Sequence, residues 1–439
     1  MGAREAAVRR LQRIEEEGAF VARLGGGLSP ADERLASDLV AGVTRLRRRL
    51  DFLLAPYVRG GLARLDAPVL QALRVGLYDL AVRGTPAHAA VSGAVGAATA
   101  VSHRGGGALV NAVLRAAARD VDAGAPARPD TGDPVEDMAT WQSYPTWLVR
   151  RWVGRYGVDE AERLLEAGNQ TPAFGLRANP LRTTTEALLE SLAELGVTAE
   201  RSRWSDDAVV VRRLQPVLAA GIVGDGRATV QDEAAALVVR VLDPQPGESV
   251  LDAAAAPGGK ALHAAERMGS QGRLLAVDMH TRRLALLERA AATHGAGIVE
   301  TLAADLRTAA RRPALAGAFD RVLLDAPCSG TGVLGRRADM RWNRMESDLP
   351  ELVALQDELL DAAAAAVREG GLLVYATCSL EPEENAERVE AFLARHPAFS
   401  REDVEGLVPG EMRTPAGDYA ALPHIHGTDG AYAARLRRA

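Results

Sequence analysis

Cysteine, lysine and aromatic side chains are scarce in this chain of 439 residues. Its two cysteines are too few for a disulfide framework, which indicates a reducing compartment. No apolar run approaches the roughly 18 residues that a membrane-spanning helix needs. The first 20 residues alternate charges and lack the apolar core of a secretion signal. We therefore expect a cytoplasmic protein without a membrane partner.

The charged residues are unevenly distributed. The net charge is −6, but residues 1–135 carry 18 arginines against 14 acidic residues, so the remainder is more acidic. A balance of this size attracts nucleic acid only weakly. Lys260 is the single lysine among 52 Lys and Arg residues, and it lies in a glycine-rich loop. This placement indicates a need for a compact ammonium group there.

The first third of the chain has the pattern of a helical domain. Ser29-Pro30-Ala31-Asp32 combines a capping serine with proline at the first helical position. Apolar residues then recur every three or four positions from Leu35 to Leu53. Four arginines lie on or beside this helix, where they form either a solvated face or an RNA contact. They are Arg45, Arg47, Arg48 and Arg49. Further helices are expected over residues 69–80, 87–101 and 108–118.

A linker and a small mixed segment follow. Residues 120–134 (DVDAGAPARPDTGDP) lack apolar periodicity and are rich in Asp, Gly, Ala and Pro, which predicts a linker that we place at 123–139. Residues 141–165 and 185–195 have helical patterns, and 208–212 reads as a short strand. A small α+β segment over 140–225 is therefore expected.

From residue 229 onward strands and helices alternate, which is typical of a doubly wound α/β sheet. A strand over 248–253 leads into a glycine-rich loop, and the next two strands are followed by Asp278 and Asp305. Such a loop lets the backbone approach a ligand, and acids at strand ends meet ribose hydroxyls and an adenine amino group. Each acid alone could instead cap a helix. The loop is not GxGxxG, and the best-fitting cofactor is S-adenosylmethionine. The loop residues expected to hold it are Ala254, Ala255, Ala256, Pro257, Gly258, Gly259 and Lys260.

Both cysteines follow apolar strands. The strand over 319–324 delivers Asp325 and Cys328, and Cys378 follows a strand over 372–377. Ligands bind at the carboxyl ends of the strands in open α/β sheets, so both thiols should face one crevice. A thiolate that adds to carbon 6 of a pyrimidine lets carbon 5 attack the methyl group of a sulfonium, and a carboxyl group near N3 stabilises the developing charge.

Two other interpretations of the thiols remain. A metal site has poor ligand spacing, even if His424 and His426 took part. Inert core thiols are common for isolated cysteines, but two at strand ends beside one crevice are harder to explain in this way. The residue pattern alone does not decide which cysteine would be the nucleophile.

The first half of the chain resembles parts of known RNA-binding and RNA-modifying proteins. Residues 73–80, 85–91 and 110–115 are similar, in order, to the NusB-like helical domain, which binds RNA and proteins and also occurs fused to RNA methyltransferases. The pieces YPTWLV (144–149) and LRANPL (176–181) resemble the segment that precedes the catalytic domain in these enzymes and helps to hold RNA.

The second half resembles the RNA 5-methylcytosine methyltransferases of the bacterial RsmB (Sun/Fmu) type, which act on small-subunit (16S) ribosomal RNA. The matching motifs are AAAPGGK (254–260), DAPCSGTG (325–332), RRADMRW (336–342) and YATCSLEPEEN (375–385). Ala338 stands where proline is usual, and Ala254 where cysteine is frequent, but neither change removes a group that the reaction needs.

The resemblance implies a role for each candidate site residue. Cys378 is expected to be the nucleophile and Cys328 to assist release of the methylated RNA. Asp325 would hydrogen-bond the base, and Lys260 would order the site near it. S-adenosylmethionine would be held by the loop around Gly258 together with Asp278, Asp305 and Asp325.

We therefore predict four parts: an all-α NusB-like RNA-binding domain (1–122), a linker (123–139), a small α+β segment (140–225) and a Rossmann-like methyltransferase domain (226–439). The expected activity is methylation of carbon 5 of a cytosine in 16S ribosomal RNA through a covalent Cys–C6 adduct, by a monomer without a metal. Alternatives are a methyltransferase of another RNA such as tRNA, or a non-catalytic NusB-like RNA-binding factor. The two cysteines, Asp325 and the glycine loop argue against the latter.

Overall fold

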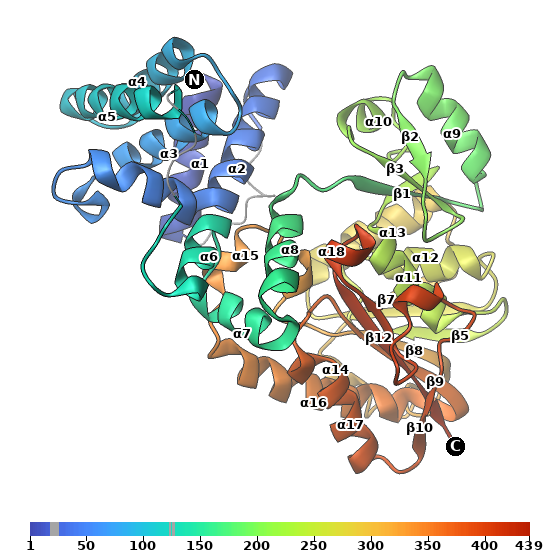
Figure 1. Cartoon of the computed structure of the whole chain (residues 1–439). Coiled ribbons are helices and arrows are strands. Elements are labelled where there is room, and N and C mark those ends of the chain that lie inside the picture. Colours follow the sequence, from blue (N-terminus) through green and yellow to red (C-terminus); the bar gives the residue numbers. More distant parts are fainter. Residues whose placement is uncertain (18–25, 123, 125–127) are drawn as a thin grey trace. The chain divides into compact units, whose positions relative to one another are not determined.

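The computed structural model describes residues 1–17, 26–122, 124 and 128–439, which fall into two compact units (Figure 1). The N-terminal unit comprises Met1–Gln170 together with Leu334–Glu346. The C-terminal unit comprises Thr171–Val333 and Ser347–Ala439. The predicted domain limits at residues 122, 140 and 226 stay predictions.

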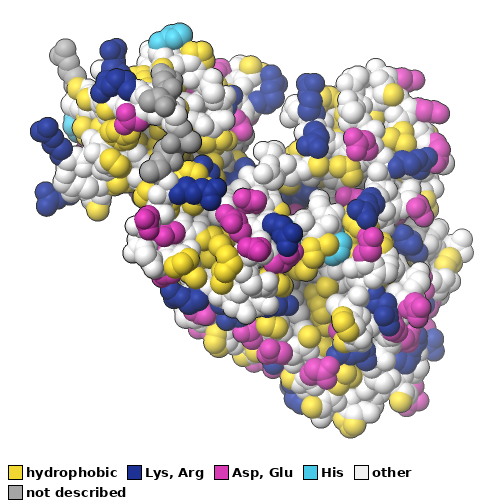
Figure 2. All heavy atoms as spheres, in the orientation of Figure 1, with side chains coloured by type: hydrophobic (Ala, Val, Ile, Leu, Met, Phe, Trp, Pro, Cys, Tyr) yellow, Lys and Arg dark blue, Asp and Glu magenta, His cyan; other side chains and the backbone are white. Residues whose placement is uncertain are grey.

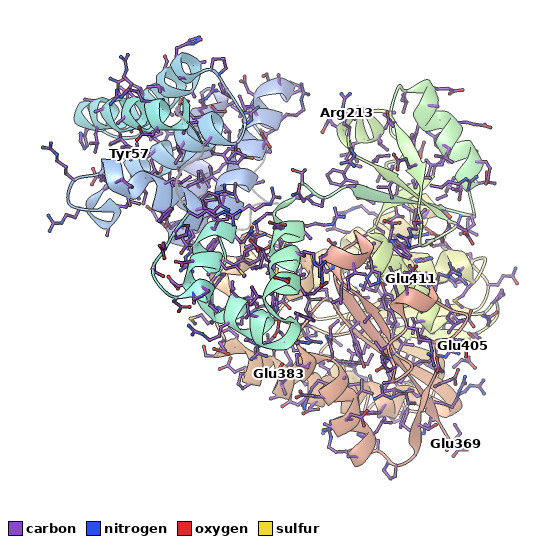
Figure 3. The ribbon with its side chains drawn as sticks, in the orientation of Figure 1. Tyr57, Arg213, Glu369, Glu383, Glu405 and Glu411 are labelled. Atoms are coloured by element: carbon purple, nitrogen blue, oxygen red, sulfur yellow. The ribbon has the colours of Figure 1, made fainter. Side chains whose placement is uncertain are left out.

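The described residues of the N-terminal unit form helices and no strands. The start of α2 is as predicted, because Pro30 is its first residue and the Ser29 hydroxyl accepts a hydrogen bond from the Asp32 amide at 3.2 Å. The predicted helices over 69–80, 87–101 and 108–118 are confirmed as α3, α4 and α5. Tyr57, labelled in Figure 3, follows α2 and donates its hydroxyl to Asp120 on α5 at 2.5 Å. The first five helices are α1 (Ala3–Glu17), α2 (Pro30–Leu54), α3 (Ala67–Ala81), α4 (Ala87–Val101) and α5 (Arg104–Asp122).

The sequence predicted a single helix over residues 141–165. The structure has three shorter helices in this part of the N-terminal unit. Ser143 adopts a left-handed conformation (φ 60°) before Pro145, and Gly157 has φ 82°, so the helix breaks at both places. Residues 134–139, predicted as linker, begin the first of these helices, and 123 and 125–127 of that linker lie outside the described residues. The helices are α6 (Pro134–Gln142), α7 (Thr146–Tyr156) and α8 (Val158–Asn169).

The arginine cluster on α2 binds other parts of its own unit. The Arg48 guanidinium donates to the Tyr144 carbonyl at 2.8 Å and forms an ion pair with Glu136. The guanidinium of Arg49 lies 3.7 Å from the centre of the Trp141 ring, and Arg45 donates to the carbonyl of Gly335 at 3.0 Å. These arginines hold neighbouring segments together, which corrects the expectation of a solvated face, while an RNA contact stays a prediction.

The C-terminal unit begins with a four-stranded antiparallel sheet in the order β2-β3-β1-β4. Helix α9 (Thr185–Glu194) packs on it through Leu188 and Leu192, which share a buried core with Leu176 and Val209. The predicted helix and short strand are confirmed here. A short helix, α10 (Gln215–Ala219), precedes the last strand. The strands are β1 (Phe174–Ala178), β2 (Ala199–Arg201), β3 (Ala208–Val211) and β4 (Ala228–Val230).

A larger, mixed sheet forms the rest of the unit and confirms the predicted Rossmann-like class. Its order is β10-β12-β9-β8-β5-β6-β7, with β11 paired to β12. Strands β5 to β9 are parallel, whereas β12 runs antiparallel to β9, β10 and β11. The strands are β5 (Ser249–Asp252), β6 (Arg273–Asp278), β7 (Val299–Ala303), β8 (Phe319–Asp325), β9 (Val367–Thr377), β10 (Phe399–Glu402), β11 (Tyr419–Ala421) and β12 (Ala431–Arg438).

Helices cover this sheet through aliphatic side chains. One buried cluster lies under α11, α12 and α13, and a second lies under α14, α16 and α17. On the face of this unit that Figure 2 shows, acidic and basic side chains are interspersed. Among the described residues of the chain, no helix is both long and apolar enough to cross a membrane. The remaining helices are α11 (Glu233–Leu242), α12 (Gly259–Arg267), α13 (Thr281–His294), α14 (Leu306–Ala309), α15 (Met340–Asn343), α16 (Asp348–Ala366), α17 (Ala386–Arg395) and α18 (Pro423–His426).

Candidate active site

The carboxyl ends of four parallel strands meet at one edge of the larger sheet. The chain runs from β5 outward to β6 and β7 and then returns to β8 on the other side of β5. Such a reversal leaves a crevice between the two central strands, where open α/β sheets bind their ligands. Asp252 ends β5, Asp278 ends β6, Asp325 ends β8, and Cys378 follows β9. The topology therefore gathers the predicted site residues Asp278, Asp325 and Cys378 at one place, together with Asp252.

The glycine-rich loop is fixed to the strands on both sides. The amide of Ala253 donates to the Leu323 carbonyl at 2.8 Å, and that of Ala255 donates to the Val277 carbonyl at 3.0 Å. Gly258 has φ 111°, and a Cβ atom there would lie 2.4 Å from a methyl group of Leu287. A larger residue is therefore excluded at Gly258 both by its backbone and by the helix behind it.

Lys260, at the start of α12, and Asp325, at the end of β8, form an ion pair in the site. The Lys260 ammonium lies 2.6 Å from Asp325 Oδ2, and the two side chains are 19% and 33% exposed. Burial would lower the pKa of Lys260, but the Asp325 carboxylate outweighs burial and raises it. The single lysine therefore stays charged and pairs with Asp325.

Asp252 is a functional candidate that sequence reasoning missed. Its side chain is buried, and among the described residues neither carboxyl oxygen meets hydrogen-bond geometry, although the Lys260 ammonium and the Ala254 amide both favour its ionised form. Burial, followed by the charge of Asp325, raises the pKa of Asp252 to about 7. Its position as the first residue before the glycine loop is the signal that could have identified it.

The two acids expected to bind an adenosine group differ in their surroundings. Asp278 accepts a hydrogen bond from the Ala256 amide at 3.1 Å, so it touches the glycine loop directly. Asp305 caps α14 by accepting from the Arg307 amide at 2.9 Å, and the Arg307 guanidinium binds both of its oxygens. Hydrogen bonds from Arg307 lower the pKa of Asp305. Asp305 is thus the cap of α14, whereas Asp278 accepts both from the glycine loop and, at 2.7 Å, from the amide of His280, the residue that precedes α13.

The two thiols lie together, as the strand ends predicted. The sulfur atoms of Cys328 and Cys378 are 3.4 Å apart. Cys328 is 9% exposed, whereas Cys378 is more open. The contact with Cys378 and then burial raise the pKa of the Cys328 thiol well above its usual range. Cys328 therefore keeps its proton at neutral pH, and Cys378 is the more accessible sulfur.

A buried hydrogen-bond network holds the two cysteine loops in register, and sequence reasoning did not anticipate it. Glu384 is fully buried and accepts from the amide of Ser329 at 2.8 Å and from the hydroxyls of Ser329 and Ser379. Gln356 on α16 donates to Glu384 at 3.0 Å and to the carbonyl of Pro327 at 2.9 Å. The Glu-Glu-Asn run that contains Glu384 was visible in the sequence, but the partners of the Glu384 carboxylate lie 28 or more residues away, apart from Ser379.

Other residues considered from the sequence lie elsewhere. His426 accepts a hydrogen bond from the Leu422 amide through Nδ1, and in the described part of the chain no group of three or more His, Cys, Asp or Glu side chains could hold a metal ion. Arg177, in a piece expected to help hold RNA, is fully buried and paired with Glu266. Its role is therefore internal.

Comparisons with known proteins agree with this arrangement. Residues 239–437 match the family described as "16S rRNA methyltransferase RsmB/F", residues 1–119 match the NusB family, and residues 144–218 match an RsmF/B-like ferredoxin-like domain. The chain is 34% identical to the "Probable ribosomal RNA small subunit methyltransferase B" of Bacillus subtilis (strain 168), over 94% of this chain and 92% of that protein.

Two further comparisons cover almost the whole length. The chain is 36% identical to the "Ribosomal RNA small subunit methyltransferase B" of Pseudomonas putida (strain KT2440), over 99% of this chain and 98% of that one. The crystal structure of PH0851 covers 100% of this chain and 99% of its own, with a TM-score of 0.81 and 28% identity. Fold and sequence thus define a Rossmann-like methyltransferase that carries a NusB helical domain and a ferredoxin-like domain. The chain belongs to the family of ribosomal RNA small subunit methyltransferase B.

Proposed function

We propose that this methyltransferase transfers a methyl group from S-adenosylmethionine to carbon 5 of a cytosine in small-subunit (16S) ribosomal RNA, through a covalent adduct with Cys378. The observation that carries this proposal is the pair of thiols 3.4 Å apart beside the Lys260–Asp325 ion pair. A methyltransferase that acts on an oxygen or an exocyclic nitrogen needs no thiol, so two thiols in the crevice favour activation of a ring carbon.

The residues act on the base in a defined order. The Cys378 thiolate forms a bond to carbon 6, and the electron pair of the ring double bond moves to carbon 5. Asp325, fixed by Lys260 at 2.6 Å, hydrogen-bonds the N3 edge and stabilises the charge that develops there. S-adenosylmethionine, when bound, supplies an electrophilic methyl group on a positively charged sulfur.

Release reverses the addition. Carbon 5 gives its proton to solvent water, the electron pair of that C–H bond restores the carbon 5–carbon 6 double bond, the carbon 6–sulfur bond breaks, and Cys378 regains the electron pair of that bond as a thiolate. Cys328, in contact with Cys378 at 3.4 Å, assists this elimination. Contact with Cys378 and burial raise the pKa of the Cys328 thiol, so its S–H can donate a hydrogen bond to the leaving sulfur.

The crevice fits the cofactor. The buried Asp252 carboxyl group lacks a hydrogen-bond partner among the described residues and would accept from the cationic amino-acid end. The loop from Ala254 to Lys260 would lie along the cofactor, with Asp278, which binds the Ala256 amide, at the ribose. Asp305 would reach the adenine only by sharing its carboxylate with Arg307.

Ribosomal RNA is favoured over tRNA because the curated relatives are small-subunit ribosomal RNA methyltransferases over nearly the full length of the chain. We assign RNA binding to residues 1–122, which include the NusB match, and to the segment 140–225 ahead of the methyltransferase domain at 226–439. The target nucleotide must leave its stack to reach two thiols in a crevice, so a loop or single-stranded target is expected. That the protein is cytoplasmic, monomeric and free of a bound metal remains a prediction.

The decisive experiment compares Cys378→Ala with Cys328→Ala. Each variant is incubated with S-adenosylmethionine labelled in its methyl group and with 16S ribosomal RNA. Denaturing gels score covalent RNA–protein adducts, and nucleoside analysis scores 5-methylcytosine. We expect Cys328→Ala to accumulate an adduct and Cys378→Ala to give neither adduct nor product, since only the latter lacks the proposed nucleophile.

Other patterns would change the proposal. Adduct accumulation in Cys378→Ala and none in Cys328→Ala would exchange the two roles. A methylated tRNA but unmethylated 16S RNA in the wild type would favour the tRNA alternative. Binding of RNA without methyl transfer to any RNA would favour a non-catalytic RNA-binding factor.

A further inference from the structure

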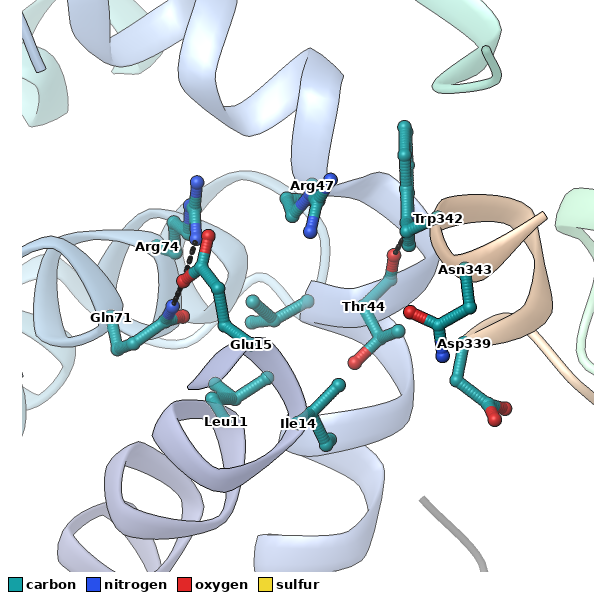
Figure 4. A pocket seen from close by; sticks show the side chains of 11 residues that line it. Leu11, Ile14, Glu15, Thr44, Arg47, Gln71, Arg74, Asp339, Trp342 and Asn343 are labelled. Atoms are coloured by element: carbon teal, nitrogen blue, oxygen red, sulfur yellow. Dashed lines mark hydrogen bonds and ion pairs between the residues drawn. The ribbon is translucent and has the colours of Figure 1, made fainter. Parts of the chain in front are cut away.

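Glu384 is a buried carboxylate that has no cationic partner among the described residues. A buried charge needs compensation, which a side chain of opposite charge can supply. Figure 4 shows such a case in the N-terminal unit, where the buried Arg74 lies in the wall of a pocket and pairs with Glu15 at 3.2 Å. Glu384, in the C-terminal unit, is fully buried, yet in the described part of the chain it forms no ion pair with a lysine, arginine or histidine.

Four uncharged donors bind the Glu384 carboxylate instead. The Ser329 amide, at 2.8 Å, and the Gln356 side chain, at 3.0 Å, donate to Oε1. The hydroxyls of Ser329 and Ser379 donate to Oε2. A carboxylate has only acceptors, so it can take all four hydrogen bonds at once, and hydroxyl bonds to a charged oxygen are stronger than those between neutral groups. Glu384 is therefore the common partner of two loops and a helix.

The residues on both sides of Cys328 are held by this network. Ser329, which follows Cys328, is bound to Glu384 through its amide and its hydroxyl. Pro327, which precedes Cys328, accepts a hydrogen bond from Gln356 at 2.9 Å, and Gln356 is itself bound to Glu384. The thiol of Cys328 thus projects from a segment that is fixed before and after it.

The residues on both sides of Cys378 are held in the same way. The Ser379 hydroxyl donates to Glu384, and the Asn385 side chain donates to the Ser379 carbonyl at 2.9 Å. The Thr377 hydroxyl donates to Asn385 Oδ1 at 2.5 Å. Glu384 and its neighbour Asn385 therefore bind the residues that flank Cys378.

Backbone hydrogen bonds leave the position of the Cys328 thiol to these side chains. Among the described residues, backbone bonds join the Cys328 loop to the Cys378 strand and loop at two points. One is the Ala326 amide on the Ala376 carbonyl at 2.8 Å, and the other is the Gly332 amide on the Cys378 carbonyl at 2.9 Å. Cys328 lies between these two points, so the side-chain network fixes the part of the loop that carries the thiol.

We propose that Glu384 is a positioning residue for the methyl transfer: by binding Ser329 and Ser379 it fixes the distance between the sulfur atoms of Cys328 and Cys378. The inference rests on the proposed two-thiol reaction, but it concerns a different property, the spacing of the two sulfurs before RNA binds.

The charge of Glu384 gives this role a signature that shape alone does not have. The contact with Cys378 and then burial raise the pKa of the Cys328 thiol, and the Glu384 carboxylate raises it further. Removal of the charge should therefore lower the pKa of Cys328.

Two variants test the carboxylate and its partner separately. Glu384→Gln keeps the size of the side chain, removes its charge and turns one acceptor into a donor. Ser329→Ala removes one hydroxyl group from the network and leaves the charge in place. Glu387→Gln is the matched control, since it makes the same change three residues away, at an exposed position of α17. Circular dichroism establishes that each variant is folded.

The cysteine content of the chain makes the sulfur spacing measurable. Cys328 and Cys378 are its only cysteines, so dibromobimane can react twice within one molecule only by joining these two. The reaction is run without RNA and with a fixed concentration of a competing small thiol. The ratio of cross-linked to singly alkylated protein then reports how closely the second sulfur lies to the first.

We expect Glu384→Gln to lower this ratio several-fold and to lose on the order of 10-fold in kcat with little change in KM for RNA, because misplaced reacting groups slow the chemical step. Ser329→Ala should show a smaller loss of the same kind. The double variant Glu384→Gln/Ser329→Ala should lose little more than Glu384→Gln alone, since both changes remove the same contact. Glu387→Gln should match the wild type.

A pH profile separates positioning from a general loss of packing. In a Cys378→Ala background, Cys328 is the only thiol, and its alkylation by iodoacetamide is measured across pH. Glu384→Gln should move the midpoint to lower pH, whereas Ser329→Ala and Glu387→Gln should leave it in place, because only the first removes the charge beside Cys328.

Several results would overturn the inference: a wild-type cross-linking ratio in folded Glu384→Gln, additive losses in the double variant, an unmoved alkylation midpoint, or an equal loss in Glu387→Gln. If Glu384→Gln does not fold, Ser329→Ala decides, and a wild-type ratio in that variant would count against the role of Glu384. If the wild type methylates no RNA, the proposed function fails, while cross-linking and alkylation still decide the positioning role.

Discussion

Two buried clusters of charged side chains lie in the C-terminal unit, and they differ in how completely they are paired. In the first, Arg177 pairs with Glu266 and donates to Gln231 at 2.8 Å, and the other Glu266 oxygen lies 2.9 Å from His294 Nδ1. In the second, Lys260 and Asp325 are paired, but Asp252 beside them lacks a hydrogen-bond partner among the described residues. We call them the closed cluster and the open cluster.

The difference in pairing distinguishes a cluster that stabilises the fold from one that is available to bind a ligand. A closed cluster compensates the loss of hydration on burial and joins segments that are distant in sequence, here β1 of the smaller sheet and α12 and α13 of the larger domain. An open cluster keeps a polar group available to a ligand, and such groups with shifted pKa values concentrate at functional sites. Buried charge alone therefore does not identify the site.

The largest expected effect comes from opening the closed cluster. Arg177→Met leaves the Glu266 carboxylate buried without its cation, which should lower the free energy of unfolding by about 3–5 kcal/mol. Urea unfolding followed by circular dichroism measures this loss. Methyl transfer per folded molecule should stay close to the wild-type value, since Arg177 does not touch the crevice.

The double variant Arg177→Met/Glu266→Leu is the matched control. Removing both charges should recover a large part of the stability, because no charge then stays buried without a partner. A single variant as stable as the wild type, or one that loses transfer without losing stability, would show that the closed cluster is not purely structural.

The second effect comes from the open cluster. Asp325→Asn removes the charge that Lys260 holds and weakens stabilisation of the base, so methyl transfer should fall on the order of 100-fold or more. Both side chains are partly exposed, so unfolding should change much less than in Arg177→Met. Single-turnover transfer and urea unfolding on the same preparations measure the two changes. A variant that loses stability but keeps its transfer rate would reverse the assignment of the two clusters.

The sequence predicted the members of the open cluster better than those of the closed one. Asp325 was identified because it ends a predicted strand, and Lys260 because it is the single lysine and lies in the glycine-rich loop. Asp252 begins the same glycine loop but was not singled out, since its missing partners become visible only in three dimensions. Burial and pairing depend on which strands become neighbours, and this is not a local property of the sequence.

The partners of several arginines were likewise not predictable from the sequence. Arg177 was expected in an RNA-holding piece, and Arg45, Arg47, Arg48 and Arg49 on a solvated face or at RNA, yet Arg177 is buried and Arg45 and Arg48 donate to backbone carbonyls of their own unit. Helix limits were predicted closely where caps were clear, as at Ser29, and poorly at Ser143, whose left-handed backbone breaks a continuous apolar pattern. Local signals thus defined elements, while the partners of long side chains followed from the tertiary fold.

The third effect is a change in the pH dependence of stability at Asp252, spread over the range from pH 3.8 to about 7. Its pKa is raised from 3.8 to about 7, so between these values the folded protein retains a proton that the unfolded chain has released. The unfolded state then binds fewer protons, and the free energy of unfolding falls as pH rises through this window, by up to about 1.4 kcal/mol per pH unit. Above about pH 7 both states are ionised and this contribution is constant.

Asp252→Asn removes that contribution, so the variant should gain stability relative to the wild type from about pH 4 to pH 7 and run parallel to it above. Urea unfolding at pH 5, 6, 7 and 8 measures the difference, and Glu200→Gln, on the exposed strand β2, is the matched control. A cationic ligand at Asp252 would favour the carboxylate, so bound S-adenosylmethionine should flatten the wild-type slope more than the variant's. Equal slopes in the two proteins would mean that Asp252 is ionised throughout, and the open cluster would then differ from the closed one only in its location.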